Sequence, residues 1–303
     1  SLDSIERVIT LFHAKICKKI IQEQYFEIDF IGFHGQTIFH NADQKISKQL
    51  GDGELLSSLL KKKVIYNFRK NDMINGGQGA PLAPIFHQLL AKKNKIKLPV
   101  GILNIGGIAN ITIINSEDSD TLKSYDIGPG NCLLDEWVRK HSKARYDKNG
   151  ELAKAGTTNK IILNQAIDNF NITNISFDIK DFDINFVRGL SLEDGLSTLT
   201  DFTAFIIYDS IIKEFNSIKD NDLKIFVCGG GRKNLFLIDV IKKKLSNNIQ
   251  LNLIDDYKID GDFVESQAFA YLAIRSYLRK PISFPQTTNV EMPCTGGVLV
   301  ENY

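Results

Sequence analysis

Two glycine-rich turns, each directly after an apolar run, are the places in this 303-residue sequence where phosphate binding is expected. Residues 104–110 read Asn-Ile-Gly-Gly-Ile-Ala-Asn, and three consecutive glycines at 229–231 follow a second apolar run. Because glycine has no Cβ, such turns let backbone N–H groups approach a phosphate, and a following helix adds its own N–H groups. The candidate nucleotide contacts are Gly106, Gly107, Asn110, Gly229, Gly230, Gly231 and Asn234.

A single glycine pair is equally typical of an ordinary hairpin. Two such turns within one βα region favour nucleotide binding over that simpler interpretation. The turns lack the third glycine of the GxGxxG dinucleotide fingerprint, and the chain contains no GxxxxGK[ST] P-loop.

A carboxylate at a predicted strand end is the candidate for proton transfer. Asp126 precedes the turn Gly128-Pro129-Gly130, so it is expected on a rigid part of the scaffold at a sheet edge. A carboxylate held in this way suits proton abstraction or metal contact. The alternative is an Asp that opens a turn or caps the next helix, and on position alone both interpretations stay open.

Polar residues in the N-terminal part could bind a hydroxylated ligand. Gln36 and Thr37 follow His34 where a predicted strand meets a loop, and they offer donors and acceptors that fit a sugar. A lone histidine is more often structural than catalytic, and the His34/His40 spacing does not suit one-face metal ligation, so no metal site is predicted from them.

Two further charged positions have two interpretations each. Arg69 and Asp72 could clamp an anionic or hydroxylated ligand, or could simply pair with each other. Glu265 could face a cleft as a buried carboxylate, or could complement the dipole of the helix that it starts.

The periodicity of apolar residues predicts the elements that must position these groups. An amphipathic helix is expected at 2–24 and a connector with a hinge role around 67–81. The stretch 145–190 is expected to be an irregular insertion. The other predicted helices are a short one after 51–53 and those at 84–91, 133–141, 192–215, 234–245 and 264–278. The predicted strands are 28–33, 64–66, 100–104, 109–114, 122–126, 224–228 and 249–253.

Residues 100–278 therefore spell β-β-β-α-(α)-β-α-β-α. This order predicts an α/β fold with one mixed sheet flanked by helices on both faces. It is the element order of the ribonuclease-H-like half found in sugar kinases, actin and Hsp70.

Composition excludes several classes of protein. Apolar residues make up 43% and charged residues 24%, which is typical of a globular chain and excludes a disordered, collagen-like or coiled-coil protein. The 37 Lys and Arg against 36 Asp and Glu give a net charge of +1, which argues against nucleic-acid binding as the main function.

Location is predicted from three absences in the sequence. Cys17, Cys132, Cys228 and Cys294 form no CxxC pair, so reduced thiols are favoured over a zinc ribbon or a disulfide framework. No run reaches the roughly 20 apolar residues of a membrane helix, and the first residues do not resemble a signal peptide. A cytoplasmic protein without a membrane partner is expected.

Taken together, eight motifs resemble the anhydro-N-acetylmuramic acid kinase family. They are HGQT, GDG, NFRxxD, GGQGAPLAP, NIGGIANIT, YDIGPGN, CGGGxxN and VESQAFAYLA, in order from about residue 2 to the C-terminus. The resemblance implies an actin-like two-domain fold and a cytoplasmic bacterial enzyme of peptidoglycan recycling. Such an enzyme uses ATP and water to convert 1,6-anhydro-N-acetylmuramic acid to N-acetylmuramic acid 6-phosphate.

The same resemblance assigns roles to the candidate residues. Asp126 matches the general base that activates water. The residues of the two glycine-rich turns match phosphate and nucleotide contacts, and Mg²⁺ is expected with the ATP. Gln36, Thr37, Asp72 and Glu265 are assigned to the sugar. Family members can form dimers, so a homodimer is a further option.

One departure from the family pattern concerns the first domain. The length favours two domains, which we place at 1–75 plus 292–303 and at 76–291. The family's first phosphate loop and first strands have no match, so the first domain is expected to be incomplete. The chain is then either a fragment or naturally truncated. The alternative functions are a non-catalytic remnant that binds sugar or nucleotide, and another actin-like sugar kinase.

Overall fold

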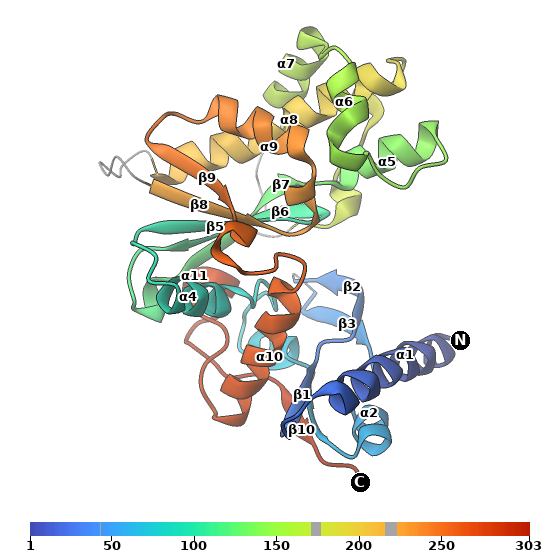
Figure 1. Cartoon of the computed structure of the whole chain (residues 1–303), viewed down its shortest axis with the longest axis vertical. Coiled ribbons are helices and arrows are strands. Elements are labelled where there is room, and N and C mark those ends of the chain that lie inside the picture. The colour runs from blue at the N-terminus through green and yellow to red at the C-terminus, as the bar shows by residue number, and fades with distance from the viewer. Residues whose placement is uncertain (43, 171–176, 216–222) are drawn as a thin grey trace. The chain divides into compact units, whose positions relative to one another are not determined.

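The computed structural model describes residues 1–42, 44–170, 177–215 and 223–303 (Figure 1). By its internal contacts the chain divides into two compact units. The first unit comprises residues 1–93, 116–124 and 265–303, and the second comprises 94–115 and 125–264.

A five-stranded sheet organises the second unit, with the strand order β7-β6-β5-β8-β9. The strands are β5 Val100–Ile105, β6 Ile108–Ile114, β7 Lys123–Pro129, β8 Leu223–Cys228 and β9 Ile249–Leu253. Strand β6 runs antiparallel to β5, whereas β5, β8 and β9 are parallel. Strands β5 and β8 are almost continuously apolar and buried, as parallel strands covered by other elements require.

The described residues of the second unit form five helices. They are α5 Cys132–His141, α6 Glu151–Ala155, α7 Lys160–Asn169, α8 Leu192–Phe215 and α9 Leu235–Lys244. Helix α8 is buried along most of its length, and its apolar residues share one core cluster with α5, α9 and alternate residues of the strands. The predicted α/β fold with a mixed sheet flanked by helices is therefore confirmed.

Part of the predicted irregular insertion is helical. The stretch 145–190 contains α6 and α7, so the expectation of irregular structure was wrong for these residues. Both helices receive caps from side chains: Asp147 accepts bonds from the amides of Leu152 and Ala153, and Asn159 accepts from the first turn of α7. Such caps stabilise short polar helices that have little apolar periodicity.

The first unit contains two small sheets. Strands β1 Phe30–Phe33 and β10 Val298–Val300 flank β4 Lys63–Tyr66, parallel and antiparallel to it respectively. Strands β2 Gln36–Asn41 and β3 Ile46–Leu50 form a separate antiparallel pair. Neither this pair nor β10 was expected from the sequence.

The helices of the first unit are mostly those expected. They are α1 Leu2–Glu23, α2 Gly53–Leu60, α3 Arg69–Ile74, α4 Pro84–Lys93, α10 Val264–Tyr277 and α11 Pro285–Thr288. Helix α3 replaces part of the expected connector. In the part of the chain that the structure describes, short 3₁₀ turns lie at Ser119–Thr121, Lys148–Gly150, Ile179–Asp181, Asn185–Val187, Gly230–Lys233 and Ile254–Tyr257.

Helix α1 buries a different face from the one its apolar residues suggest. Its buried residues are Thr10 and Ala14, whereas Leu2, Phe12 and other large apolar residues are exposed. The Thr10 hydroxyl donates to the Glu6 carbonyl at 2.8 Å and accepts from the Asp52 amide at 3.0 Å. The small buried side chains and the hydrogen bonds of Thr10, and not the apolar stripe, hold this helix against the rest of the unit.

Helices α4 and α10 group with the first unit by their contacts, whereas the sequence-based boundary places residues 76–291 in the second domain. For α10 the physical reason is a close approach to β1. A Cβ at Gly32 would lie 2.6 Å from the Phe269 carbonyl oxygen, so only glycine permits this distance between strand and helix.

Candidate active site

The turn between β5 and β6 and the turn after β7 are joined by backbone hydrogen bonds. The Gly130 amide donates to the Gly107 carbonyl at 2.9 Å, and the Asn131 amide donates to the Gly106 carbonyl at 2.8 Å. The Asn131 side-chain amide also donates to Gly106, at 3.0 Å. Two of the predicted glycines are thus held by their carbonyl groups.

The three-glycine turn after β8 packs against the end of β5. Gly229 has φ 78°, and a Cβ there would overlap the Asn104 side chain. A Cβ at Gly231 would overlap the side chain of Ile105. Gly230 differs because a Cβ added to it would have no other atom within 4 Å. The outer glycines therefore allow close packing, and the middle one faces open space.

Arg232 fixes this turn from the other side. It is almost fully buried, and its Nη1 donates to the Gly229 carbonyl at 3.0 Å. The guanidinium also donates to Asp255 at 2.7 Å and to Asp262 at 2.8 Å, and its bond to Asp255 is the largest cause of its raised pKa. The carboxylates compensate the buried charge, as a buried guanidinium requires.

A cavity of about 390 Å³ opens beside Gly230. Its walls come from the start of α5, the segment 146–149 and the turn that leads into α9. The lining residues are Asn131, Leu134, Asp135, Tyr146, Asp147, Lys148, Asn149, Gly230, Lys233 and Asn234. Its volume and mixed walls suit a small ligand such as a nucleotide.

Several of the cavity's polar groups have structural partners. Asn234 caps α9, and its Oδ1 accepts from the Leu237 amide at 3.0 Å. Asp147 uses both carboxylate oxygens to cap α6. Burial raises the pKa of Asp135, and the nearby charge of Arg139 opposes that shift. Lys233 pairs with Asp262 at the surface.

The predicted nucleotide contacts are only partly brought together at this cavity. Gly230 and Asn234 line it directly, and the Gly106 carbonyl accepts from Asn131, which also lines it. The Gly107 carbonyl accepts from Gly130 and Cys132. Asn110 lies within β6, opposite Asn104 in the ladder. The lining residues that sequence reasoning missed are Asn131, Leu134, Asp135, Lys233 and the 146–149 segment. The GPGN motif could have indicated Asn131.

Asp126 lies within β7 and not at the end of a strand. The strand continues to Pro129, so the expected position at its last residue was wrong. The half-buried carboxylate accepts a hydrogen bond from the Phe177 amide at 2.9 Å through Oδ2. That bond orients one carboxylate oxygen, and a general base must be positioned in this way.

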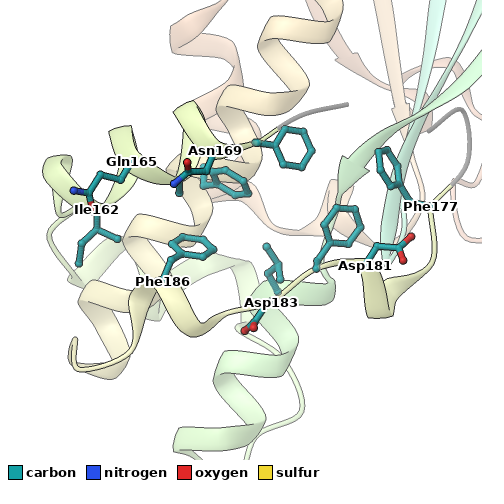
Figure 2. Close-up of a pocket in the computed structure, with 12 residues that line it drawn as sticks. Ile162, Gln165, Asn169, Phe177, Asp181, Asp183 and Phe186 are labelled. Atoms are coloured by element: carbon teal, nitrogen blue, oxygen red, sulfur yellow. The ribbon is translucent and has the colours of Figure 1, made fainter. Parts of the chain in front are cut away.

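A second cavity, of about 660 Å³, lies in the same unit (Figure 2). Phe177, whose amide bonds Asp126, contributes to its wall together with Phe170, Phe182, Phe186 and Phe202. In Figure 2 the labelled polar residues Gln165, Asn169, Asp181 and Asp183 lie around these rings. No residue predicted for the site lines this cavity.

The residues predicted for the sugar lie in the first unit, on β2, α3 and α10. Gln36 is exposed in β2, and Thr37 accepts from Gln49 at 3.3 Å. Asp72 is only 1% exposed; it accepts from the Gly79 amide at 2.6 Å and from Thr288 at 2.5 Å. Glu265 is exposed, so the interpretation as a buried carboxylate was wrong.

A polar cavity of about 280 Å³ also lies in the first unit. Its lining residues are Glu6, His34, Ser47, Lys48, Gln49, Gly51, Asp52, Glu54, Tyr66 and Asn67. None of the four predicted sugar residues is among them. His34, which the sequence favoured as a structural residue, accepts a hydrogen bond from Nε of Arg69 at 3.2 Å.

The carboxylates on the wall of the 390 Å³ cavity fit Mg²⁺ only as one or two ligands. Among the residues that the structure describes, no group of three or more His, Cys, Asp or Glu could hold a metal ion. Mg²⁺ in nucleotide sites keeps several waters and takes phosphate oxygens with one or two carboxylates. The carboxylates on the cavity wall, Asp135 and Asp147, match that smaller demand.

Comparison with known proteins decides the family. The family model described as anhydro-N-acetylmuramic acid kinase matches residues 1–302. The chain belongs to the anhydro-N-acetylmuramic acid kinase family. It is accordingly a kinase, a phosphotransferase that uses ATP, and the resemblance seen in its motifs is confirmed.

The relatives are similar over nearly the whole chain. An anhydro-N-acetylmuramic acid kinase from Pelagibacter ubique is 66% identical over all of this chain and 82% of its own length. One from Zymomonas mobilis is 38% identical over 96% of this chain and 79% of its own length. Within the described part of this kinase, no helix has the length and apolar character needed to cross a membrane.

Among solved structures, an activator of 2-hydroxyisocaproyl-CoA dehydratase from Clostridium difficile with bound ADPNP shows a weak likeness. It is 14% identical, with a TM-score of 0.35 over 62% of this chain and 66% of that chain. A likeness at this level carries no argument.

Proposed function

We propose that this protein uses ATP and water to open 1,6-anhydro-N-acetylmuramic acid and phosphorylate it to N-acetylmuramic acid 6-phosphate. The reaction would serve peptidoglycan recycling in the cytoplasm. The observation that carries the proposal, beyond family membership, is the interlocked set of glycine turns beside the 390 Å³ cavity. A kinase needs such a place, where backbone groups and a cavity wall can hold ATP.

The second unit would bind the nucleotide. Gly229 and Gly231 keep the turn packed on β5, so Gly230 is presented to the cavity with its backbone accessible. Lys233 and Lys148 on the cavity wall could balance part of the phosphate charge. The network around Arg232 would keep this arrangement fixed before ATP arrives, which lowers the ordering cost of binding.

Asp126 would act as the general base. It would take a proton from a water molecule whose oxygen attacks the anomeric carbon of the anhydro sugar. The bond between that carbon and O6 breaks, and O6 forms a bond to the γ-phosphorus as the bond to ADP breaks. The Phe177 amide supports this role because it orients the carboxylate.

Mg²⁺ would accompany the ATP. Asp135 and Asp147 are the residues that could hold it together with phosphate oxygens. When bound, the ion supplies neutralisation of the charge on the transferring phosphoryl group.

Product analysis tests the proposal. The purified chain is incubated with ATP, Mg²⁺ and the anhydro sugar in ¹⁸O-labelled water, and the products are analysed by mass spectrometry. The expected product is the 6-phosphate with one ¹⁸O in the sugar and none in ADP. Phosphorylation of glucose but not of the anhydro sugar would overturn the substrate assignment, and no turnover with any sugar would overturn the kinase reaction for this chain.

A further inference from the structure

Arg69, at the start of α3, is a half-buried cation that is held along one edge. Its Nε donates a hydrogen bond to Nε2 of His34 at 3.2 Å. The other ring nitrogen of His34, Nδ1, lies 3.0 Å from the Gly35 carbonyl oxygen. Because a carbonyl can only accept, Nδ1 carries the proton and Nε2 offers its lone pair to Arg69.

The environment keeps His34 in this neutral form. Burial and the neighbouring charge of Arg69 lower the pKa of His34 to about 4. The ring also packs against Phe269, with 4.3 Å between ring centroids. At neutral pH the imidazole is therefore a fixed acceptor, and it sets the orientation of the guanidinium.

The other edge of the guanidinium carries its two terminal nitrogens, Nη1 and Nη2. Among the described residues, no hydrogen bond or ion pair reaches the two terminal nitrogens of Arg69. Glu265 is close enough for its charge to raise the pKa of Arg69, yet the two make no ion pair within 4.0 Å. Burial acts in the opposite direction and is the larger effect on that pKa.

An oriented and partly desolvated guanidinium whose two terminal nitrogens make no hydrogen bond to the described residues suits a carboxylate ligand. Two parallel N–H groups match the two oxygens of a carboxylate, and partial burial strengthens that bond relative to water. A neutral hydroxyl would leave one donor without a partner. The fixed geometry selects an acid over a polyol.

We propose that the terminal nitrogens of Arg69 bind the carboxylate of the sugar substrate and so select muramic acid over its neutral analogue. This inference rests on the proposed function for the identity of the sugar. N-acetylmuramic acid carries a lactyl ether whose carboxylate is ionised at neutral pH. The analogue 1,6-anhydro-N-acetylglucosamine has the same ring and acetamide but lacks that ether.

The test measures the binding of both anhydro sugars by calorimetry, without ATP. We compare the full chain with its Arg69→Met, Arg69→Lys and Lys70→Met variants. Lys70 is the exposed neighbour of Arg69 and serves as the matched control. Arg69→Met should weaken binding of the acid by about 100-fold and change binding of the neutral sugar by less than about threefold. Arg69→Lys, which keeps the charge but not the fork, should cost roughly 10-fold for the acid alone.

The ratio of the two affinities separates selection from misfolding, because a folding defect would weaken both sugars alike. Equal losses for both sugars, an unchanged preference in Arg69→Met, or a parent chain without preference for the acid would overturn the inference. Product analysis on the same samples tests the reaction separately. Acid-selective binding without product would reject the proposed reaction but support the role of Arg69. Product formation without acid-selective binding would support the reaction but reject the role of Arg69.

Discussion

Both units contain a glycine-rich loop, but the two loops differ in what occupies their polar groups. In the second unit, glycines 229 and 231 pack on β5 and leave Gly230 beside a cavity. In the first unit, the loop 76–79 wraps around the buried carboxylate of Asp72. A Cβ at Gly77 would overlap that carboxylate, and the Gly79 amide donates to it.

The difference teaches that the partner of a glycine loop, and not the glycines themselves, decides whether the loop can bind a ligand. A carboxylate of the chain already takes the Gly79 donor, so the loop in the first unit is closed by its own chain. The turn in the second unit is supported from behind by Arg232, through the Gly229 carbonyl, and its middle residue stays accessible.

The largest expected effect tests whether chemistry resides in the second unit. Asp126→Asn removes the base while the amide oxygen can still accept the bond from Phe177. We expect turnover to fall by at least about 1000-fold, with nucleotide affinity unchanged. Rates from phosphate-product assays and ATP affinities from calorimetry provide the check. Activity within tenfold of the parent would contradict the role of general base.

A glycine pair tests the open turn directly. Gly231→Ala places a methyl group against the buried Ile105, whereas Gly230→Ala adds one where no atom lies within 4 Å. We expect Gly231→Ala to weaken ATP binding by about tenfold and to lower the free energy of unfolding by about 2 kcal/mol. Gly230→Ala, the matched control for packing, should change the free energy of unfolding little. Equal losses in both variants would show that close packing on β5 is not what the glycines provide.

Sequence periodicity predicted most elements because their burial follows a local pattern. Helix α8 was predicted with its observed ends, and strands β5 and β8 were clear as short apolar runs. The pair β2 and β3 was missed because its residues are mostly polar and half-exposed, so no alternation marks them. Strand β10 has three residues, and its pairing with β4 joins positions far apart in the chain.

The candidate site could be predicted only where one short segment carries it. The glycine turns can be recognised from composition alone, and the family motifs made Asp126 the candidate general base. The cavity could not be predicted, since residues 146–149 meet Gly230 only through the folded chain. The partner of Asp72 is Thr288, which is 216 positions away, so its buried structural contacts have no local signal.

Asp72 tests the closed loop of the first unit. Asp72→Ala leaves the Gly79 amide without its acceptor in a buried place, so we expect the free energy of unfolding to fall by about 3 kcal/mol. Asp72→Asn should cost less, because the amide can accept from Gly79 and donate to Thr288. Chemical denaturation measures both. ATP affinity should remain that of the parent, and a loss of sugar binding in the stable Asn variant would instead support the predicted ligand role.

The last comparison concerns the loss of stability in acid. It should also show which of the two units opens first as the pH falls. Burial lowers the pKa of His87 in α4 to about 4, from an ordinary value of about 6.5. The unfolded chain therefore binds a proton before the folded chain does as the pH falls. Stability from a neutral His87 is complete above about pH 6.5 and is lost progressively down to about pH 4.

His87→Gln should remove this dependence and flatten the fall of unfolding free energy between pH 6.5 and 4 by on the order of 2 kcal/mol. Denaturant titrations across this pH range measure the slopes, and hydrogen exchange locates the loss. Because His34 shares the lowered pKa and also lies in the first unit, exchange at pH 5 should rise there first. An earlier rise in the second unit would mean that its carboxylate networks, such as the one around Arg232, are the weaker structure in acid.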